Sequence, residues 1–115
     1  MNAAAFAAEW IEAWNAHDLN RILALYAEDV VLVSPKVGAI LGEPSGTVRG
    51  KAMLRDYFSR GLARLPDITF VFEAVYAGLN SVVVRYKSYD GRGASEAMVF
   101  GTDGLVREVR AHYLD

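Results

Sequence analysis

The chain has 115 residues, of which 53% are hydrophobic and 23% are charged, and its 12 basic and 14 acidic side chains leave a net charge of −2. This length corresponds to one domain over residues 1–115, and the apolar content excludes an intrinsically disordered chain. The absence of cysteine excludes disulfides, thiol nucleophiles and thiolate metal sites. The lack of a clustered basic face argues against nucleic acid as a partner. The apolar content is high for so small a chain, so we expect a lined pocket, a subunit interface, or both.

The first residues resemble neither a secretory signal nor a membrane anchor. Met1–Ala8 is rich in alanine but lacks a basic start, and Glu9 and Glu12 interrupt the apolar run well short of the roughly 18 residues that a membrane span needs. We therefore expect a cytoplasmic protein without a membrane partner.

Two amphipathic helices are predicted first. Apolar residues recur at three- and four-residue spacing from Phe6 to Trp14, which predicts a helix that ends near Ala16. Its two tryptophans either pack in the core or line a pocket. Asp18 is a good N-cap for a second, shorter helix that ends before Glu28. The predicted inner face of that helix is Leu19, Ile22, Leu23 and Tyr26.

A short strand and a long loop are predicted next. The β-branched run Val30–Val33, closed by Ser34-Pro35, is typical of a buried strand, because proline cannot donate to a strand ladder. Several glycines and a proline between Lys36 and Gly50 predict a loop, with a short strand at Ala39–Leu41.

A third helix and a series of strands complete the predicted fold. Lys51–Arg64 has a helical apolar face, and Pro66 enforces its end. Beyond Pro66 the apolar pattern becomes that of strands separated by Gly, Asn and Asp turns, which predicts an antiparallel meander. The predicted strands are Ile68–Ala77, Ser81–Ser88, Ala94–Phe100 and Leu105–Tyr113. Three N-terminal helices against an antiparallel sheet make an α+β architecture without internal repeats.

The final hairpin predicts the surroundings of one acidic side chain. A two-residue turn at Asp103-Gly104 places Glu96 directly opposite Ala111. Its neighbours on that face are then Ala94, Met98, Phe100, Val109 and Tyr113. A carboxyl group among apolar side chains is costly to ionise, so desolvation should raise its pKa unless a partner compensates. The alternative is that the two faces of this strand are exchanged and Glu96 lies in water.

Other motifs for catalysis or binding are imperfect or missing. Gly46–Ala52 is superficially like a phosphate loop, but its glycine spacing is one residue short and the hydroxyl after the lysine is missing. No G-x-S-x-G nucleophile motif occurs. The two histidines, His17 and His112, lie far apart in sequence and form no metal-ligand pattern. We therefore expect neither a metal nor a cofactor.

Several motifs follow one another in a recognisable order. They are Trp14-Asn-Ala-His-Asp-Leu, Tyr26-Ala-Glu-Asp-Val, Ser34-Pro35, Gly50-Lys-Ala, Phe58 and Gly61-Leu62. With the order of elements, they resemble the nuclear transport factor 2-like superfamily nearly end to end, and within it the SnoaL-like polyketide cyclases and the ketosteroid isomerases. The resemblance implies a cone of three helices enclosed by a strongly curved antiparallel sheet, an apolar pocket at the open end, and a homodimer through the sheet's outer face. It implies no single activity, because this fold hosts both enzymes and non-enzymatic binders.

The resemblance also assigns roles to individual residues. The general base of the isomerases, an aspartate before proline, falls on Ser34, whose hydroxyl cannot remove a proton from carbon at neutral pH without a base of its own. Trp10 and Phe58 stand where the isomerases have two tyrosines, and a third tyrosine is retained as Tyr26. The remaining oxyanion donor, an aspartic acid in the isomerases, falls on Glu96. Steroid isomerisation by the family mechanism is therefore not expected.

Three functions follow as hypotheses. In the first, Glu96 donates a proton or a hydrogen bond to a small apolar carbonyl metabolite in isomerase-, cyclase- or lyase-type chemistry, with Ser34 as a secondary catalytic candidate. The second is a non-catalytic binder of an apolar ligand. The third is a dimeric interaction module whose pocket is filled by aromatic side chains. The candidate ligand-binding residues are Trp10, Trp14, Tyr26, Phe58, Met98, Val109 and Tyr113.

Overall fold

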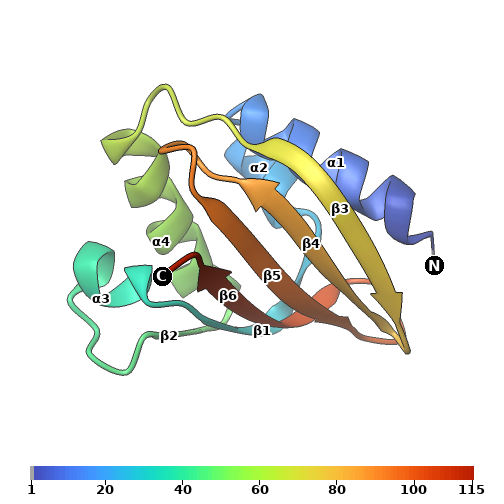
Figure 1. Cartoon of the computed structure of the whole chain (residues 1–115). Helices are drawn as coiled ribbons and strands as arrows, with labels where there is room; N and C mark the ends of the chain where they lie inside the picture. Colours follow the sequence, from blue (N-terminus) through green and yellow to red (C-terminus); the bar gives the residue numbers. More distant parts are fainter. Residues whose placement is uncertain (1) are drawn as a thin grey trace.

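A computed structural model describes residues 2–115, in which six strands form one open, curved sheet with helices packed against it (Figure 1). The helices are α1 (Ala3–Asn15), α2 (Leu19–Leu23), α3 (Lys36–Leu41) and α4 (Lys51–Arg64). The strands are β1 (Tyr26–Val33), β2 (Thr47–Arg49), β3 (Val71–Gly78), β4 (Ser81–Lys87), β5 (Gly93–Phe100) and β6 (Val106–Tyr113). This confirms the predicted α+β architecture. No helix formed by residues 2–115 is both long and apolar enough to span a membrane.

The order of strands in the sheet is β2-β1-β6-β5-β4-β3. Neighbouring strands are antiparallel, as predicted, with the exception of β1 and β6, which run parallel. Leu32 on β1 pairs with Val109 on β6. The N-terminal half of the chain therefore pairs, through β1, with β6, which is the last strand of the C-terminal meander.

The second predicted helix is shorter than expected. Asp18 caps α2, as predicted, but the helix ends at Leu23, so the assignment of Tyr26 to its inner face is wrong. The helix ends early because the chain pairs with β6 instead. The Leu25 carbonyl accepts a hydrogen bond of 2.9 Å from the Val106 amide, and Tyr26 is paired with Val106 in the sheet. Long-range pairing thus extends β1 over residues that local patterning assigns to a helix.

The segment between Lys36 and Gly50 contains helix α3 and strand β2, so the predicted loop and its strand at Ala39–Leu41 are both wrong. Pro35 has a φ of −62°, which is already helical, and α3 begins after it. Gly42 ends the helix with a φ of 73°, a left-handed conformation that glycine adopts without a steric cost. The structure thus places Lys36 in the first turn of a helix.

The C-terminal meander forms as predicted, including the pairing of Glu96 with Ala111. The two-residue turn is wrong, because the Gly101 amide donates to the Leu105 carbonyl at 2.9 Å and so closes a longer loop. The pairing then shifts by one residue immediately before the loop. The two deviations cancel, and the register around Glu96 is the predicted one.

Polar side chains of α1 and of the turn after it bind the backbone of residues 68–70, which lead into β3. The side-chain amide of Asn15 donates to the Phe70 carbonyl at 3.0 Å, and its oxygen accepts from the Phe70 amide at 2.7 Å. His17 Nε2 donates to the Ile68 carbonyl at 2.6 Å. These bonds bring the Phe70 ring to 5.7 Å from that of Trp10, in the centre of the core. The Trp-Asn-Ala-His motif is therefore a structural tie between helix and sheet.

Candidate functional site

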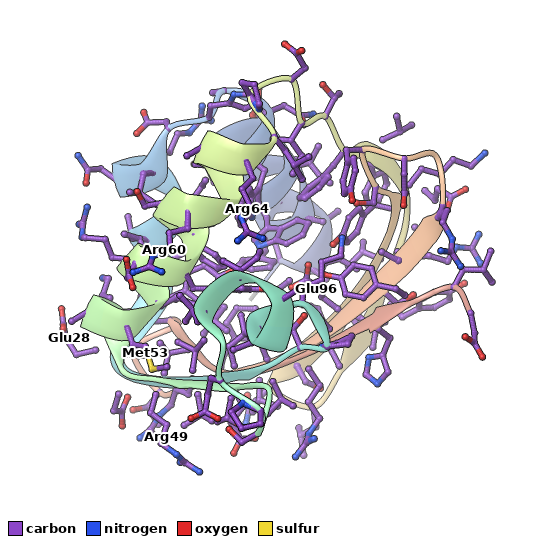
Figure 2. The ribbon with its side chains drawn as sticks, turned by 90° about the vertical axis from the view of Figure 1, so that its left-hand side faces the viewer. Glu28, Arg49, Met53, Arg60, Arg64 and Glu96 are labelled. Carbon is purple, nitrogen blue, oxygen red and sulfur yellow. The ribbon has the colours of Figure 1, made fainter. Side chains whose placement is uncertain are left out.

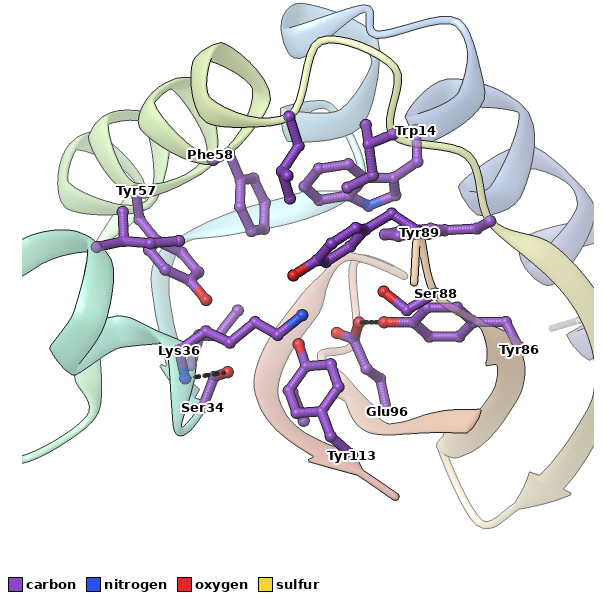
Figure 3. Close-up of a pocket in the computed structure, with 17 residues that line it drawn as sticks. Trp14, Ser34, Lys36, Tyr57, Phe58, Tyr86, Ser88, Tyr89, Glu96 and Tyr113 are labelled. Carbon is purple, nitrogen blue, oxygen red and sulfur yellow. Dashed lines mark hydrogen bonds between the residues drawn. The ribbon is translucent and has the colours of Figure 1, made fainter. Parts of the chain in front are cut away.

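A cavity of about 80 Å³ lies between the sheet, α3 and α4 (Figure 3). Its apolar lining is Trp14, Leu32, Ile40, Phe58, Gly61, Leu65, Ile68, Phe70 and Ala111. Its polar lining is Ser34, Lys36, Tyr57, Tyr86, Ser88, Tyr89, Glu96 and Tyr113. Pockets for drug-sized ligands occupy roughly 300–1,000 Å³. This cavity therefore suits a small compound with an apolar body and a few polar groups.

Glu96 is the acidic group of the cavity. It lies on the inward face of β5, is only 8% exposed, and is seen inside the molecule in Figure 2, whereas Glu28 and Arg49 project outward. The alternative in which the faces of β5 are exchanged is therefore wrong. Tyr86 Oη, on the neighbouring strand β4, donates to Glu96 Oε2 at 2.6 Å. The other carboxyl oxygen, Oε1, has no hydrogen-bond partner among residues 2–115.

The environment of Glu96 favours its neutral form. Burial raises the pKa of Glu96 to about 7, although the Tyr86 hydrogen bond and the positive charge of Lys36 act in the opposite direction. A large fraction of the carboxyl groups is therefore protonated at neutral pH. With Oε2 occupied by Tyr86, the proton can be carried on Oε1 and offered to a ligand.

Lys36 extends into the same cavity from α3 (Figure 3). Its Nζ lies 4.2 Å from the centre of the Tyr113 ring and 4.9 Å from that of Tyr89, which are cation–π contacts. Partial burial lowers the pKa of Lys36, while the charges of Asp90 and Glu96 oppose that change. Among residues 2–115, Lys36 forms no direct ion pair.

Neutral hydroxyl groups surround Glu96 and Lys36. Ser34 is buried, and its Oγ accepts a hydrogen bond of 3.2 Å from the Lys36 amide. Burial raises the pKa of the phenols of Tyr57, Tyr86 and Tyr113. These phenols remain neutral donors and acceptors over the physiological pH range.

Comparison with known proteins decides the family. The sequence profile of the SnoaL-like domain family matches residues 7–110, which is most of the chain. This chain belongs to the SnoaL-like family. The resemblance drawn from its motifs is therefore confirmed. No curated protein matches the chain.

Solved structures share the fold over more than nine-tenths of their length. A SnoaL-like protein of unknown function from Burkholderia thailandensis is 43% identical, with 98% of this chain and 94% of that chain covered and a TM-score of 0.94. IdmH, a candidate polyketide cyclase from Streptomyces antibioticus, is 20% identical, with coverages of 98% and 92% and a TM-score of 0.79. A candidate isomerase of the SnoaL-like family from Agrobacterium tumefaciens is 17% identical, with coverages of 98% and 97% and a TM-score of 0.77. The last two similarities establish a common fold and nothing about substrate.

The fold of this SnoaL-like protein divides the predicted site residues into two groups. Those that line the cavity are Trp14, Ser34, Phe58, Glu96 and Tyr113. Those that lie in the core outside its lining are Trp10, Tyr26, Met98 and Val109. Trp10 is fully buried, and its Nε1 donates to Tyr26 Oη at 2.9 Å. The tyrosine that the resemblance retains therefore satisfies a buried tryptophan and does not reach the cavity.

Several lining residues were missed by sequence reasoning, namely Lys36, Tyr57, Tyr86, Ser88 and Tyr89. Tyr86 could have been found, because Val82, Val84 and Tyr86 alternate along β4 and the pairing of Val84 with Glu96 makes Tyr86 a diagonal neighbour. Lys36 could not, because its position depends on a helix that the glycine-rich pattern hid.

The histidines of this SnoaL-like protein serve separate purposes. His17 binds the Ile68 carbonyl, whereas His112 is exposed on β6 and its Nδ1 lies 3.1 Å from the Arg110 carbonyl. The described part of the chain, residues 2–115, contains no group of three or more acidic or histidine side chains placed to hold a metal ion.

Proposed function

We propose that this SnoaL-like protein is an enzyme that uses Glu96 as a hydrogen-bond or proton donor to a small carbonyl compound, in isomerase-, cyclase- or lyase-type chemistry. One observation carries the proposal: a buried carboxyl group is held by Tyr86 through one oxygen, and its other oxygen, which has no hydrogen-bond partner among residues 2–115, lies at a largely apolar cavity. A neutral acid in such a place stabilises negative charge that develops on a carbonyl oxygen.

The other lining residues support this use of Glu96. Tyr86 fixes the orientation of the carboxyl group, while Trp14 and Phe58 provide apolar surface for the body of a ligand. Ser34 offers a second hydroxyl, but among residues 2–115 it has no carboxylate partner that could make it a base. We therefore expect no ketosteroid isomerisation by the family mechanism. The reaction classes named for two structural relatives, a candidate cyclase and a candidate isomerase, agree with chemistry at a carbonyl group.

Infrared spectroscopy of bound cyclopentanone tests the proposal, because a hydrogen bond lowers the carbonyl stretching frequency. In the wild-type protein at pH 6, we expect a bound carbonyl band at lower frequency than in Glu96→Leu, and we expect it to shift back as pH rises past 7. Glu108→Leu, a change of an exposed acid on β6, should leave the band unchanged. If cyclopentanone binds equally well to the wild type and to Glu96→Leu, with the same carbonyl frequency, Glu96 is not the proposed donor and a non-catalytic binder is the better description.

We also propose that a second copy of the chain covers the outer face of the sheet. Val71, Tyr76, Val83 and Val99 are large apolar side chains exposed on β3, β4 and β5, and Tyr76 pairs directly with Val83. Such a patch favours an isologous dimer. Light scattering should give a dimer mass for the wild type and a monomer mass for Val83→Glu, while Ala63→Glu on α4 should remain a dimer. A monomeric wild type would contradict this proposal.

A further inference from the structure

The ammonium group of Lys36 forms no ion pair with any carboxylate among residues 2–115. The ion pairs formed within residues 2–115 join Arg21, Arg60, Arg85 and Arg107 to carboxylates. Lys36 is different, because its Nζ faces two aromatic rings and has neither an ion pair nor a hydrogen-bond acceptor in the described chain. A cation that is partly removed from water and lacks an acceptor is ready to bind an anion from outside.

The charged groups around Lys36 do not prevent it from binding an external anion. The charges of Asp90 and Arg92 act on the pKa of Lys36 in opposite directions, because the carboxylate raises it and the guanidinium lowers it. Glu96 is held by Tyr86 and is largely neutral below pH 7. The polar end of the cavity therefore carries a net positive charge at mildly acidic pH.

We propose that the cavity binds a small organic acid, whose carboxylate accepts hydrogen bonds from Lys36 Nζ while its apolar body packs against Trp14 and Phe58. The inference rests on the proposed function and narrows its substrate class to a small carbonyl compound that also carries a carboxylate. In that arrangement the carboxylate pairs with Lys36, and the carbonyl oxygen faces Oε1 of Glu96. The volume of about 80 Å³ restricts the acid to a few carbon atoms.

A matched pair of probes isolates the charge. Isobutyrate and isobutyramide have the same apolar body and nearly the same shape, and only the first is an anion. We expect isobutyrate to bind the wild-type protein at least about 10-fold more tightly than isobutyramide at pH 6, measured by NMR titration, because hydrogen bonds between charged groups are the stronger ones. Equal affinities for the two probes would overturn the inference.

Variants of Lys36 assign the effect to one side chain. Lys36→Met keeps an unbranched aliphatic side chain and removes the charge, and we expect it to lose about 10–100-fold in affinity for isobutyrate while its affinity for isobutyramide is unchanged. Lys36→Arg keeps the charge and should retain the preference. Lys87→Met, a change of an exposed lysine on β4, is the matched control and should bind as the wild type does. Circular dichroism establishes that each variant is folded, and an unchanged preference in folded Lys36→Met would overturn the inference.

Proton uptake provides a second readout. A carboxylate beside Glu96 disfavours ionisation of that side chain, so isobutyrate should bind more weakly as pH rises from 6 to 8, and binding near pH 7 should take up protons. The titratable and charged groups that interact electrostatically with Glu96 or Lys36 are Tyr26, Tyr57, Tyr86, Tyr113, Asp90 and Arg92. The pKa of each of these tyrosines is raised by burial, so none of the four titrates in this range.

Calorimetry in two buffers of different ionisation enthalpy measures the uptake. It should be present in the wild type and absent in Glu96→Gln. Lys36-dependent isobutyrate binding without proton uptake would leave the carboxylate site standing and remove the role of Glu96 beside it. The frequency of bound cyclopentanone tests Glu96 without a carboxylate, so failure of this inference and failure of the proposed function are distinguishable.

Discussion

Glu96→Gln should make the protein more stable above pH 7 and should remove most of the change in its stability between pH 4.5 and 7. Burial raises the pKa of Glu96 from 4.5 to about 7, so the folded protein holds this proton more tightly than the unfolded chain does. The stabilisation is therefore fully present below pH 4.5 and is lost as pH rises through 7. The difference corresponds to about 3 kcal/mol of unfolding free energy. Glutamine keeps an acceptor for Tyr86 and cannot ionise.

Urea unfolding at several pH values measures this effect. The wild-type free energy of unfolding should fall between pH 5 and pH 8 by more than that of Glu96→Gln, and Glu108→Gln should follow the wild type. Tyr86→Phe should move the wild-type transition to higher pH, because the Tyr86 hydrogen bond lowers the pKa of Glu96. Parallel pH profiles for the wild type and Glu96→Gln would show that the carboxyl group titrates normally.

Trp10→Phe should destabilise the protein by about 2–3 kcal/mol, whereas Trp14→Phe should cost about 1 kcal/mol. Both tryptophans lie on α1 and both are buried, so the loss of apolar surface is similar. Their indole nitrogens differ. Trp10 Nε1 donates to Tyr26 Oη at 2.9 Å, whereas Trp14 Nε1 is buried without a hydrogen-bond partner in the described chain. Phenylalanine at position 14 removes an unsatisfied donor, and at position 10 it removes a bond that a buried phenol needs.

A double-mutant cycle checks that explanation. Tyr26→Phe alone leaves the Trp10 donor unpaired in the core and should cost about 1–3 kcal/mol. The double variant should cost less than the sum of the two single changes, because both ends of the bond are removed together. Strict additivity, or equal costs at Trp10 and Trp14, would mean that packing alone determines the stability of this helix.

Local sequence signals predicted the elements that depend on local chemistry. Asp18 caps a helix, Pro66 follows one, and the apolar pattern from β4 to β6 fixes which face of each strand is buried. Glu96 could be placed from that alternation and one turn, and an error in the turn was cancelled by a shift in pairing. The alternation of apolar residues along the strands was therefore enough to predict the position of Glu96.

The position of Lys36 in the site depends on contacts between segments that are distant in sequence. Helix α3 has only six residues, too few to be stable alone, and it forms because Val37 is buried in the core and Gly42 ends the helix. No local pattern reports such packing, so Lys36 was assigned to a loop. The hydrogen bond between Trp10 and Tyr26 is hidden for the same reason, since it joins a helix to a strand.

The parallel pairing of β1 with β6 brings together the two segments of the chain that carry Lys36 and Glu96. Leu32 and Val109 are partners although 77 positions separate them, and a pairing between residues so far apart in sequence has a high cost in loop-closure entropy. Lys36 follows β1 and Glu96 lies on β5, which pairs with β6. The acid and the amine thus lie on opposite sides of this junction. The complete site therefore exists only when the two halves of the chain have paired, and any ligand that contacts both side chains stabilises the longest-range pairing in the sheet.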